Sequence, residues 1–419
     1  MVLNDFKNAQ ARLVEVYGEA AAEKQAARYE KAIAAFEAAF GAREDAIIVS
    51  APGRTEIGGN HTDHNNGHVL AAAINLDCIA VTAPSPDGKT RVISEGHGAV
   101  VIDLSDLSVR EDEKSTTAAL IRGVAKGLTN FGYKTGGFVA YVTSDVLAGS
   151  GLSSSAAFES LIGAIQSHLY NDGKIEAVEI AISGKLAENE YYGKASGLMD
   201  QTASANGGFV AIDFKDTANP VIDAVQFDIS AAGYDLVVVA VGDDHENLSD
   251  QYSAIPAEMK EVAKIFGCSL LRELDKETVL KNVGVIREAV NDRAVLRAIH
   301  FFDDDARAVR EAELLRAGDF EGFMAEINAS GLSSVRYLQN ITDIHNPYQQ
   351  GIALALCLAQ TVLEGKGAWR IHGGGFGGTT LNFVPHDTLE EFISVMENAF
   401  GEGCCHVLSV RRDGAIRVL

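Results

Sequence analysis

Glycine and small hydroxyl residues cluster at residues 146–157, in the run VLAGSGLSSSAA, directly before a stretch of helix-forming composition. Without side chains at Gly149 and Gly151 the backbone can approach a ligand closely. The first amide groups of the following helix are unpaired donors at the positive end of its dipole. The run therefore predicts an anion site with phosphate as its ligand, although a small-residue turn before a packed helix has the same composition. It lacks a Walker-type lysine, so it is not a P-loop.

A second segment, APGRTEIGGNHTDHNNG at residues 51–67, concentrates polar and charged residues in a loop between expected strands. Such a density of polar groups favours a binding site over a core. A turn whose Asn and Asp side chains cap their own backbone is the alternative. Metal binding by His61, Asp63 and His64 is a weaker alternative, because neighbouring residues on an extended chain point in opposite directions and the sequence offers no distant histidine partner.

A third segment, RIHGGGFGGTT at residues 370–380, contains five glycines in six positions. Such a run costs much backbone entropy unless the chain must come close to another group. We therefore expect part of the molecule to lie against this loop, with a tight structural hairpin as the alternative.

These three segments, in this order, resemble the GHMP kinase superfamily and, within it, the galactokinase family. A fourth segment between them, AENEYYGKASGLMDQ at residues 187–201, resembles the family segment that carries a catalytic aspartate. Four ordered motifs are a much stronger signal than one. The resemblance implies an ATP-dependent kinase that phosphorylates the anomeric C1 hydroxyl of galactose and releases galactose 1-phosphate and ADP.

The resemblance also implies which residues perform this reaction, which depends on alignment and charge stabilisation more than on covalent chemistry. Asp200 lies beside the anomeric hydroxyl, to remove its proton or to orient it, and Arg54 keeps Asp200 ionised and stabilises the transferring group. Mg²⁺ is held by Ser155 and Glu188, in agreement with its preference for hard oxygen ligands. The ATP phosphates are held by Gly149, Ser150, Gly151, Leu152, Ser153, Ser154 and Ser155.

For the sugar, the resemblance implies contacts from Asn60, His61, Asp63, Gly197 and Tyr252. Tyr252 follows His245 at the spacing that the family shows between its histidine and its tyrosine. Asn60 departs from the pattern, because galactokinases usually have a glutamate there, which binds the hydroxyl at the far end of the sugar. An amide does not repel a carboxylate, so galacturonate or another modified galactose-like sugar stays open as the substrate.

A sugar- and ATP-binding regulator without turnover is the alternative from a different functional class. Such proteins tend to lose residues of the phosphate loop or the catalytic aspartate. Intact Ser153, Ser154, Ser155 and Asp200 favour an enzyme.

The composition of the 419-residue chain restricts its partners and surroundings. A formal net charge of −23 and a pI near 4.8 disfavour nucleic acid and anionic membranes, which would be repelled at long range. No apolar run reaches the length of a membrane span, and Asp5 and Lys7 lie where a signal peptide needs an apolar core. We therefore expect a cytoplasmic protein. Its five cysteines are scattered and predict reduced, mostly buried thiols. The sequence does not indicate an oligomeric state.

The expected fold class is α+β. The resemblance implies two lobes, an N-terminal nucleotide-binding α/β domain over residues 1–215 and a C-terminal ferredoxin-like α+β domain over residues 216–419, with the active site between them. Periodicity predicts helices up to residue 40 and at 154–170, 175–192, 257–266, 276–281, 295–317 and 348–364. It predicts strands at 46–50, 69–81, 90–93, 100–104, 137–144, 209–214, 234–241, 367–371, 379–384 and 405–409.

Overall fold

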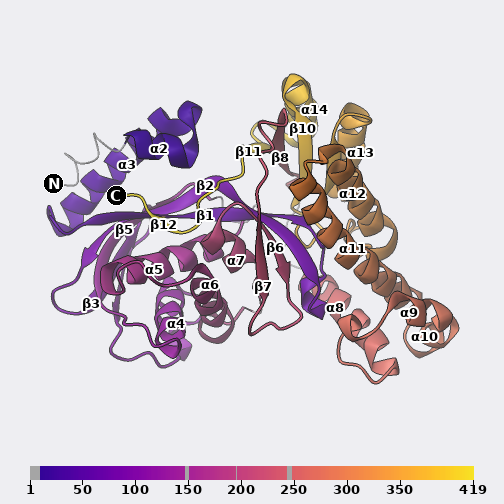
Figure 1. The fold of residues 1–419 in the computed structure, drawn as a ribbon, viewed down its shortest axis with the longest axis horizontal. Coiled ribbons are helices and arrows are strands. Elements are labelled where there is room, and N and C mark those ends of the chain that lie inside the picture. The colour runs from indigo at the N-terminus through magenta and orange to yellow at the C-terminus, as the bar shows by residue number, and fades with distance from the viewer. Residues whose placement is uncertain (1–9, 147–150, 195, 243–247) are drawn as a thin grey trace.

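Two β-sheets, each covered by helices, form the two lobes of the molecule (Figure 1). The computed structural model describes residues 10–146, 151–194, 196–242 and 248–419. The first sheet has eight strands and lies in the N-terminal lobe, and the second has four antiparallel strands. The prediction of an α+β fold is confirmed.

Two long strands, β1 (Ile47–Gly58) and β2 (His68–Pro84), form the centre of the first sheet. Its order is β12-β1-β2-β5-β3-β4, and β6 and β7 extend it from the early part of β2. The β3–β5 pair is parallel and the others are antiparallel. The remaining strands are β3 (Lys89–Ser94), β4 (Ala99–Asp103), β5 (Phe138–Ser144), β6 (Phe209–Asp213), β7 (Val221–Val225) and β12 (Ile416–Arg417).

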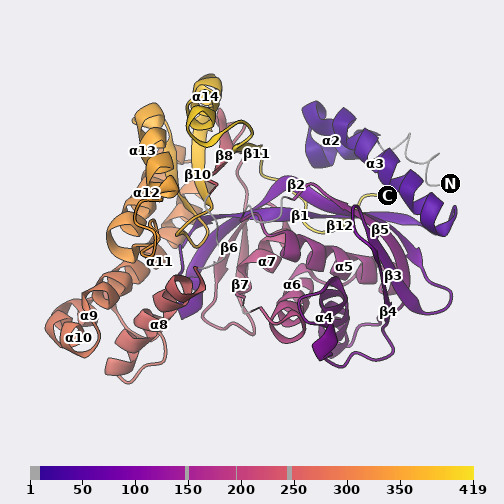
Figure 2. The same cartoon turned by 180° about the vertical axis from the view of Figure 1, so that it is seen from behind.

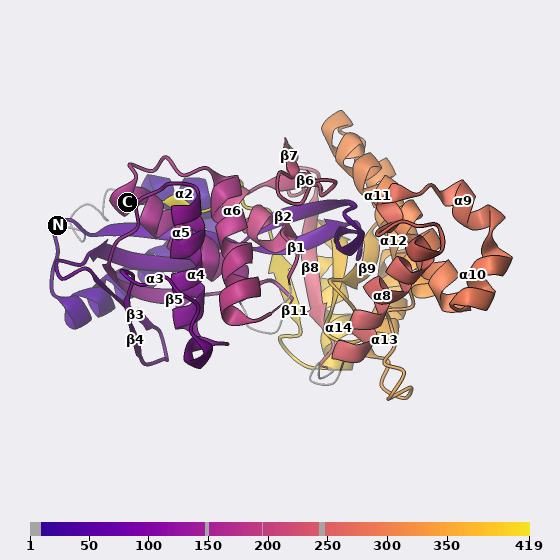
Figure 3. The same cartoon turned by 90° about the horizontal axis from the view of Figure 1, so that it is seen from below.

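Helices cover both faces of this sheet (Figures 1 and 2). One face packs against α2 (Gln10–Tyr17) and α3 (Glu19–Phe40) through a separate apolar cluster. The other face, seen from below in Figure 3, carries α4 (Thr117–Asn130), α5 (Ser154–Tyr170), α6 (Ala177–Leu186) and α7 (Met199–Asn206).

Helix α4 is absent from the sequence-based prediction because Gly123 and Gly127 lower its helix propensity. The structure explains both glycines. A Cβ at Gly123 would lie 2.5 Å from the Cα of Ala187, and one at Gly127 would lie 2.6 Å from the Cα of Ser183. The two glycines therefore let α4 pack against α6 and the turn after it at backbone distance.

In the second lobe, the sheet order is β11-β8-β10-β9. Its strands are β8 (Tyr234–Ala240), β9 (Ala368–His372), β10 (Thr379–Pro385) and β11 (Cys405–Leu408). One face packs against α11 (Asp292–Ala317) and α12 (Phe320–Ser333), and the other against α13 (Gly351–Leu363) and α14 (Leu389–Phe400). Helices α8 (Ser249–Ile265), α9 (Lys276–Lys281) and α10 (Val283–Ala289) lie at the outer end of α11 (Figure 1).

The chain returns to the first sheet after it leaves the second. Strand β12 pairs with β1 at Val49 and Ser50, and the backbone of Ile48 bonds to Val418 and Leu419. The far ends of β1 and β2 in turn contact α11 of the second lobe. A boundary near residue 215 stays a prediction.

Most predicted elements are confirmed, with the differences at their ends. Helix α8 begins before Pro256, which the prediction placed ahead of the helix start. Besides α4, the prediction missed α7, α10, α12, α14, β7 and β12. All five cysteines are free thiols, but only Cys78 and Cys404 are buried, so the prediction of mostly buried thiols is wrong. Among the helices of the described ranges, none is long and apolar enough to cross a membrane.

Candidate active site

Arg54 on β1 and Asp200 in the first turn of α7 form a two-pronged ion pair. Arg54 donates from Nε to Asp200 Oδ1 and from Nη2 to Oδ2, both at 2.6 Å, and Ser153 Oγ donates to Oδ2 at 2.6 Å. Burial alone would raise the pKa of Asp200, but the charge of Arg54 and these hydrogen bonds outweigh it and lower that pKa. Asp200 is therefore a carboxylate, and its Oδ1 keeps one acceptor position.

The described part of the glycine run is held against β1. The amide of Arg54 bonds to the carbonyl of Leu152 at 3.0 Å, and Arg54 Nη1 bonds to the carbonyl of Gly151. Gly151 has φ +74°, in the left-handed region that favours glycine. Gly149 and Ser150 lie outside the described residues.

Helix α5 begins directly after this loop and carries no side-chain cap. Ser153 precedes it, but its hydroxyl binds Asp200 and makes no cap hydrogen bond. A helix start leaves its first amides without backbone acceptors, and the positive end of the dipole favours an anion there. Ser154 and Ser155 lie in this first turn, so the local structure fits the predicted phosphate site.

Ser155 and Glu188 meet beside this helix start. Ser155 Oγ donates to Glu188 Oε1 at 2.9 Å, and Lys194 Nζ contacts the same oxygen at 2.8 Å. Glu188 lies in a π-helical turn, η3 (Ala187–Tyr192), that continues α6. Such turns often occur at functional sites. Hydroxyl and carboxylate oxygens are the hard ligands that Mg²⁺ prefers, so the chemistry of this pair fits that ion.

Two buried side chains behind Glu188 were not anticipated from the sequence. Gln201 Nε2 donates to Glu188 Oε2 at 3.0 Å and to Glu159 Oε2 at 2.9 Å. Burial and the nearby charge of Glu188 raise the pKa of Glu159 well above its usual value. Gln201 thereby fixes the orientation of Glu188.

Within the described residues there is no group of three or more His, Cys, Asp or Glu able to hold a metal ion.

His61, Tyr252 and Gly374 come together from three distant segments. His61 Nε2 donates to the carbonyl of Gly374 at 2.9 Å, which leaves Nδ1 as an acceptor. Burial and the charge of His64 lower the pKa of His61 to about 4, so the ring is neutral. The rings of His61 and Tyr252 are 5.5 Å apart. Burial and the charge of Glu56 raise the pKa of Tyr252 to about 12.

Asp63 and Gly197, also predicted to contact the sugar, are neighbours. Asp63 lies in the short 3₁₀ turn η1 (Asp63–Asn65) after β1. A Cβ at Gly197 would lie 2.6 Å from Asp63 Oδ2, so glycine is needed for this approach. The carboxylate and the backbone at residue 197 therefore face each other across a short gap.

Asn60 does not make the contact expected of it, because its side chain is enclosed by protein. It is 0 % exposed. Its Nδ2 donates to Glu56 Oε1 at 2.9 Å and to the carbonyl of Gly373 at 2.7 Å, and its Oδ1 accepts from Asn340 Nδ2 at 2.9 Å. Asn60 thus joins β1 to the glycine loop and has no free group for a substrate.

The glycine-rich third segment lies against the residues described above, as expected. A Cβ at Gly374 would be 1.4 Å from the Tyr252 hydroxyl, and one at Gly375 would be 2.1 Å from the Asn340 carbonyl. His372, at the end of β9, bonds to Thr55 at 3.0 Å. Burial, followed by the charges of Arg54 and Arg370, lowers the pKa of His372 to about 3.

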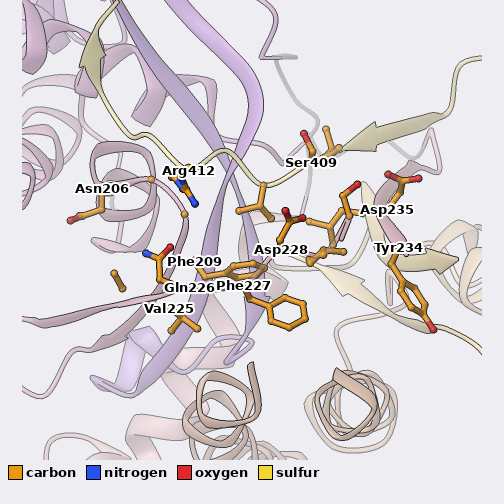
Figure 4. Close-up of a pocket in the computed structure, with 18 of the residues that line it drawn as sticks. Asn206, Phe209, Val225, Gln226, Phe227, Asp228, Tyr234, Asp235, Ser409 and Arg412 are labelled. Atoms are coloured by element: carbon orange, nitrogen blue, oxygen red, sulfur yellow. The ribbon is translucent and has the colours of Figure 1, made fainter. Parts of the chain in front are cut away.

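A cavity of about 530 Å³ lies elsewhere, where the two lobes adjoin (Figure 4). Its walls include Phe209, Phe227, Asp228, Tyr234 and Arg412. None of the predicted site residues lines it. We therefore locate the candidate site by the contacts among the predicted residues, and not by this cavity.

Two family models match this chain. The model described as the galactokinase galactose-binding signature matches residues 34–84, and the GHMP kinases N terminal domain matches residues 119–208. Galactokinase of Streptococcus thermophilus is 31% identical over 378 residues, which are 88% of this chain and 92% of that protein. Galactokinase of Streptococcus mutans is 32% identical over 367 residues, 85% of this chain and 89% of that protein.

Solved structures show the same fold. Galactokinase of Lactococcus lactis, crystallised in complex with galactose, superposes with a TM-score of 0.77 at 24% identity. The match covers 92% of this chain and 98% of that one. Mevalonate kinase of Methanococcus jannaschii superposes with a TM-score of 0.60 at 14% identity, over 88% of this chain and 99% of the other.

Proposed function

Because the chain belongs to the galactokinase family of the GHMP kinase superfamily, we propose that it transfers the γ-phosphoryl group of ATP to the C1 hydroxyl of galactose. The products are galactose 1-phosphate and ADP. Use of ATP follows from membership of the superfamily, and the residue roles below are supported by the contacts in the site.

The uncapped start of α5 and the loop before it bind the phosphates of ATP. The first amides of α5 are donors at the end of the helix where the dipole favours negative charge, and Ser154 and Ser155 lie in this turn. Gly149 and Ser150 complete the loop in this proposal.

Ser155 and Glu188 would hold Mg²⁺, which would neutralise charge on the phosphate groups when bound. Gln201 keeps Glu188 in place, and Lys194 supplies a further positive charge on the same carboxylate.

Asp200 aligns the C1 hydroxyl by accepting its hydrogen bond at the free position of Oδ1. A carboxylate whose pKa is lowered is a weak base, which supports alignment of the hydroxyl over early proton removal. Arg54 holds Asp200 in position and places positive charge near the transferring group.

His61, Asp63, Tyr252 and the backbone of Gly197 bind the remaining hydroxyls. His61 Nδ1 and the Asp63 carboxylate accept hydrogen bonds, and the neutral Tyr252 hydroxyl can donate or accept. The close approach of Gly197 keeps the Asp63 carboxylate beside the segment that also carries Asp200.

The observation that carries the proposal is the Arg54–Asp200 pair, with Ser153 joining it to the start of α5. Asp200, which aligns the sugar hydroxyl, is thereby hydrogen-bonded to Ser153, the residue directly before the phosphate-binding start of α5. The test is an ADP-release assay with ATP, Mg²⁺ and a panel of galactose, galacturonate and N-acetylgalactosamine. Galactose-dependent ADP release is expected, with ³¹P NMR identifying galactose 1-phosphate. Galactose binding without ADP release would favour a regulator, and a preference for another sugar would reassign the substrate.

A further inference from the structure

Glu56 lies on β1 close to Arg54, and both residues are mostly buried, with 6 % and 9 % exposed. The strand is regular between them, since Arg54 pairs with Ala73 and Glu56 with Ala71. The two side chains therefore leave the same face of the strand, about 7 Å apart at the usual rise per residue. This separation is comparable to the length of a hexose. The sequence patterns gave Glu56 no role.

One carboxylate oxygen of Glu56 is fixed by the protein. Oε1 accepts from Asn60 Nδ2 at 2.9 Å and from Arg370 Nη2 at 2.8 Å. Arg370 is fully buried, and its other nitrogens bond to the backbone carbonyls of Ile57 and Ile371. Arg370 thus anchors the carboxylate and is not free to turn toward a ligand.

The other oxygen of Glu56 is available. Among the described residues, none donates a hydrogen bond to Oε2, and this oxygen is not one of the fully buried polar atoms without a partner, so it is open to a donor from outside the protein. Burial raises the pKa of Glu56, and the charges of Arg370 and Arg54 oppose that rise. The charge of Glu56 in turn raises the pKa of Tyr252, so Glu56 lies close to residues proposed to surround the substrate. Oε2 therefore lacks a donor at the point where a sugar hydroxyl can supply one.

We propose that Glu56 is a specificity-determining residue of this kinase. Oε2 accepts a hydrogen bond from the galactose hydroxyl at the end of the ring far from Asp200. Asn60 acts as a positioning residue, which holds Oε1 and so directs Oε2. This inference rests on the proposed function.

The same arrangement selects against acidic sugars. A uronate would bring its carboxylate next to Glu56, and each of the three nitrogens of Arg370 already donates to a protein acceptor. Two carboxylates in a mostly buried site without a free cation repel each other strongly. The neutral amide of Asn60 left galacturonate open as a substrate, whereas the charge of the adjacent Glu56 excludes it.

The test measures equilibrium binding of galactose by calorimetry to the full-length wild-type protein, Glu56→Gln and Glu311→Gln. Glu311→Gln is the matched control, because Glu311 is also buried and near Arg370 but lies on α11 against Gly58. We expect Glu56→Gln to raise the galactose Kd about 10- to 100-fold, the usual loss for a hydrogen bond to a charged group. The control should change it less than about twofold.

Deoxy sugars separate a direct contact from a structural effect. One of the two sugars 4-deoxygalactose and 6-deoxygalactose lacks the hydroxyl that Glu56 binds. For that sugar the wild type and Glu56→Gln should have the same Kd, because the interaction is absent in both. An equal loss with galactose and with both deoxy sugars would mean that Glu56 acts only through the fold, and the inference would be wrong.

A measurement on the wild-type protein covers the case in which Glu56→Gln does not fold. Galacturonate should bind at least about 100-fold more weakly than galactose, and comparable affinities would overturn the inference.

The role of Glu56 and the proposed function fail in different ways. No galactose-dependent ADP release by the wild type rejects the proposed function. Normal turnover, with galactose affinity unchanged in Glu56→Gln, rejects only the role of Glu56.

Discussion

Arg54 and Asp200 are 146 residues apart in the chain, and their side chains meet through two parallel hydrogen bonds of 2.6 Å. Arg54 also bonds to the carbonyl of Gly151. A single guanidinium on β1 therefore holds both the start of α7 and the loop before α5. The predictions below depend on this arrangement and on the groups around it.

Replacement of Asp200 by Asn should abolish most of the activity while the protein still folds. The amide keeps the shape of the side chain but loses the charge that aligns the hydroxyl and pairs with Arg54. We expect kcat to fall about 10²- to 10⁴-fold, with an unchanged far-UV circular dichroism spectrum. Steady-state ADP release and thermal melting are the measurements. Near-normal turnover would remove Asp200 from its proposed role.

Ser155→Ala and Glu188→Gln should weaken the dependence on Mg²⁺ more than the binding of sugar. Each variant removes one of the two oxygen ligands proposed for the ion, so the Mg²⁺ concentration for half-maximal activity should rise about tenfold or more. Galactose affinity without nucleotide should not change. Ser160→Ala is the control, because Ser160 is buried in the same helix and its hydroxyl has no partner among the described residues. An unchanged Mg²⁺ requirement in both variants would contradict the assignment.

Gly374→Ala should impair sugar binding through Tyr252. The new Cβ would lie 1.4 Å from the Tyr252 hydroxyl, so the ring must move. We expect the KM for galactose to rise about tenfold or more, with the KM for ATP nearly constant. Gly98→Ala is the matched control, since a Cβ at Gly98 would meet no atom within 4 Å. Equal behaviour of the two variants would show that the contact is unimportant.

Glu311→Gln should make stability less dependent on pH. Both oxygens of Glu311 are buried without a hydrogen bond among the described residues, and burial raises its pKa to about 8. The folded state then holds a proton that the unfolded state has lost above its ordinary pKa. The free energy of unfolding of the wild type should therefore fall as the pH rises toward about 8. Urea denaturation at pH 5, 6.5 and 8 measures this fall. An equal fall in Glu311→Gln would assign it to other groups.

The sequence predicted the groups of the candidate site better than their neighbours. The resemblance of four ordered motifs to the galactokinase family identified Arg54, Ser153, Ser155, Glu188 and Asp200. The structure brings them together in the contacts described.

Asn60 and Glu56 show why the remainder could not be predicted. Both lie in one motif, and the sequence does not tell which side chain faces a ligand and which is enclosed. That distinction comes from Arg370 and Asn340, which are more than 270 residues away and bond to Glu56 and Asn60, respectively. The glycines of α4 were misleading for the same reason. They lower the helix propensity of that segment, and the close contact with α6 that requires them cannot be read from the local sequence.

The return of β12 to β1 has a consequence for biosynthesis. The outer edge of β1 at Val49 and Ser50 stays unpaired until residues 416–417 leave the ribosome. At about 5–20 residues per second, this takes on the order of 20–70 s. During that time the nascent chain displays an open strand edge, which is a template for association with other chains. The N-terminal lobe therefore completes its sheet only after translation of the C-terminal lobe, and chaperones that shield strand edges should increase the yield of native protein.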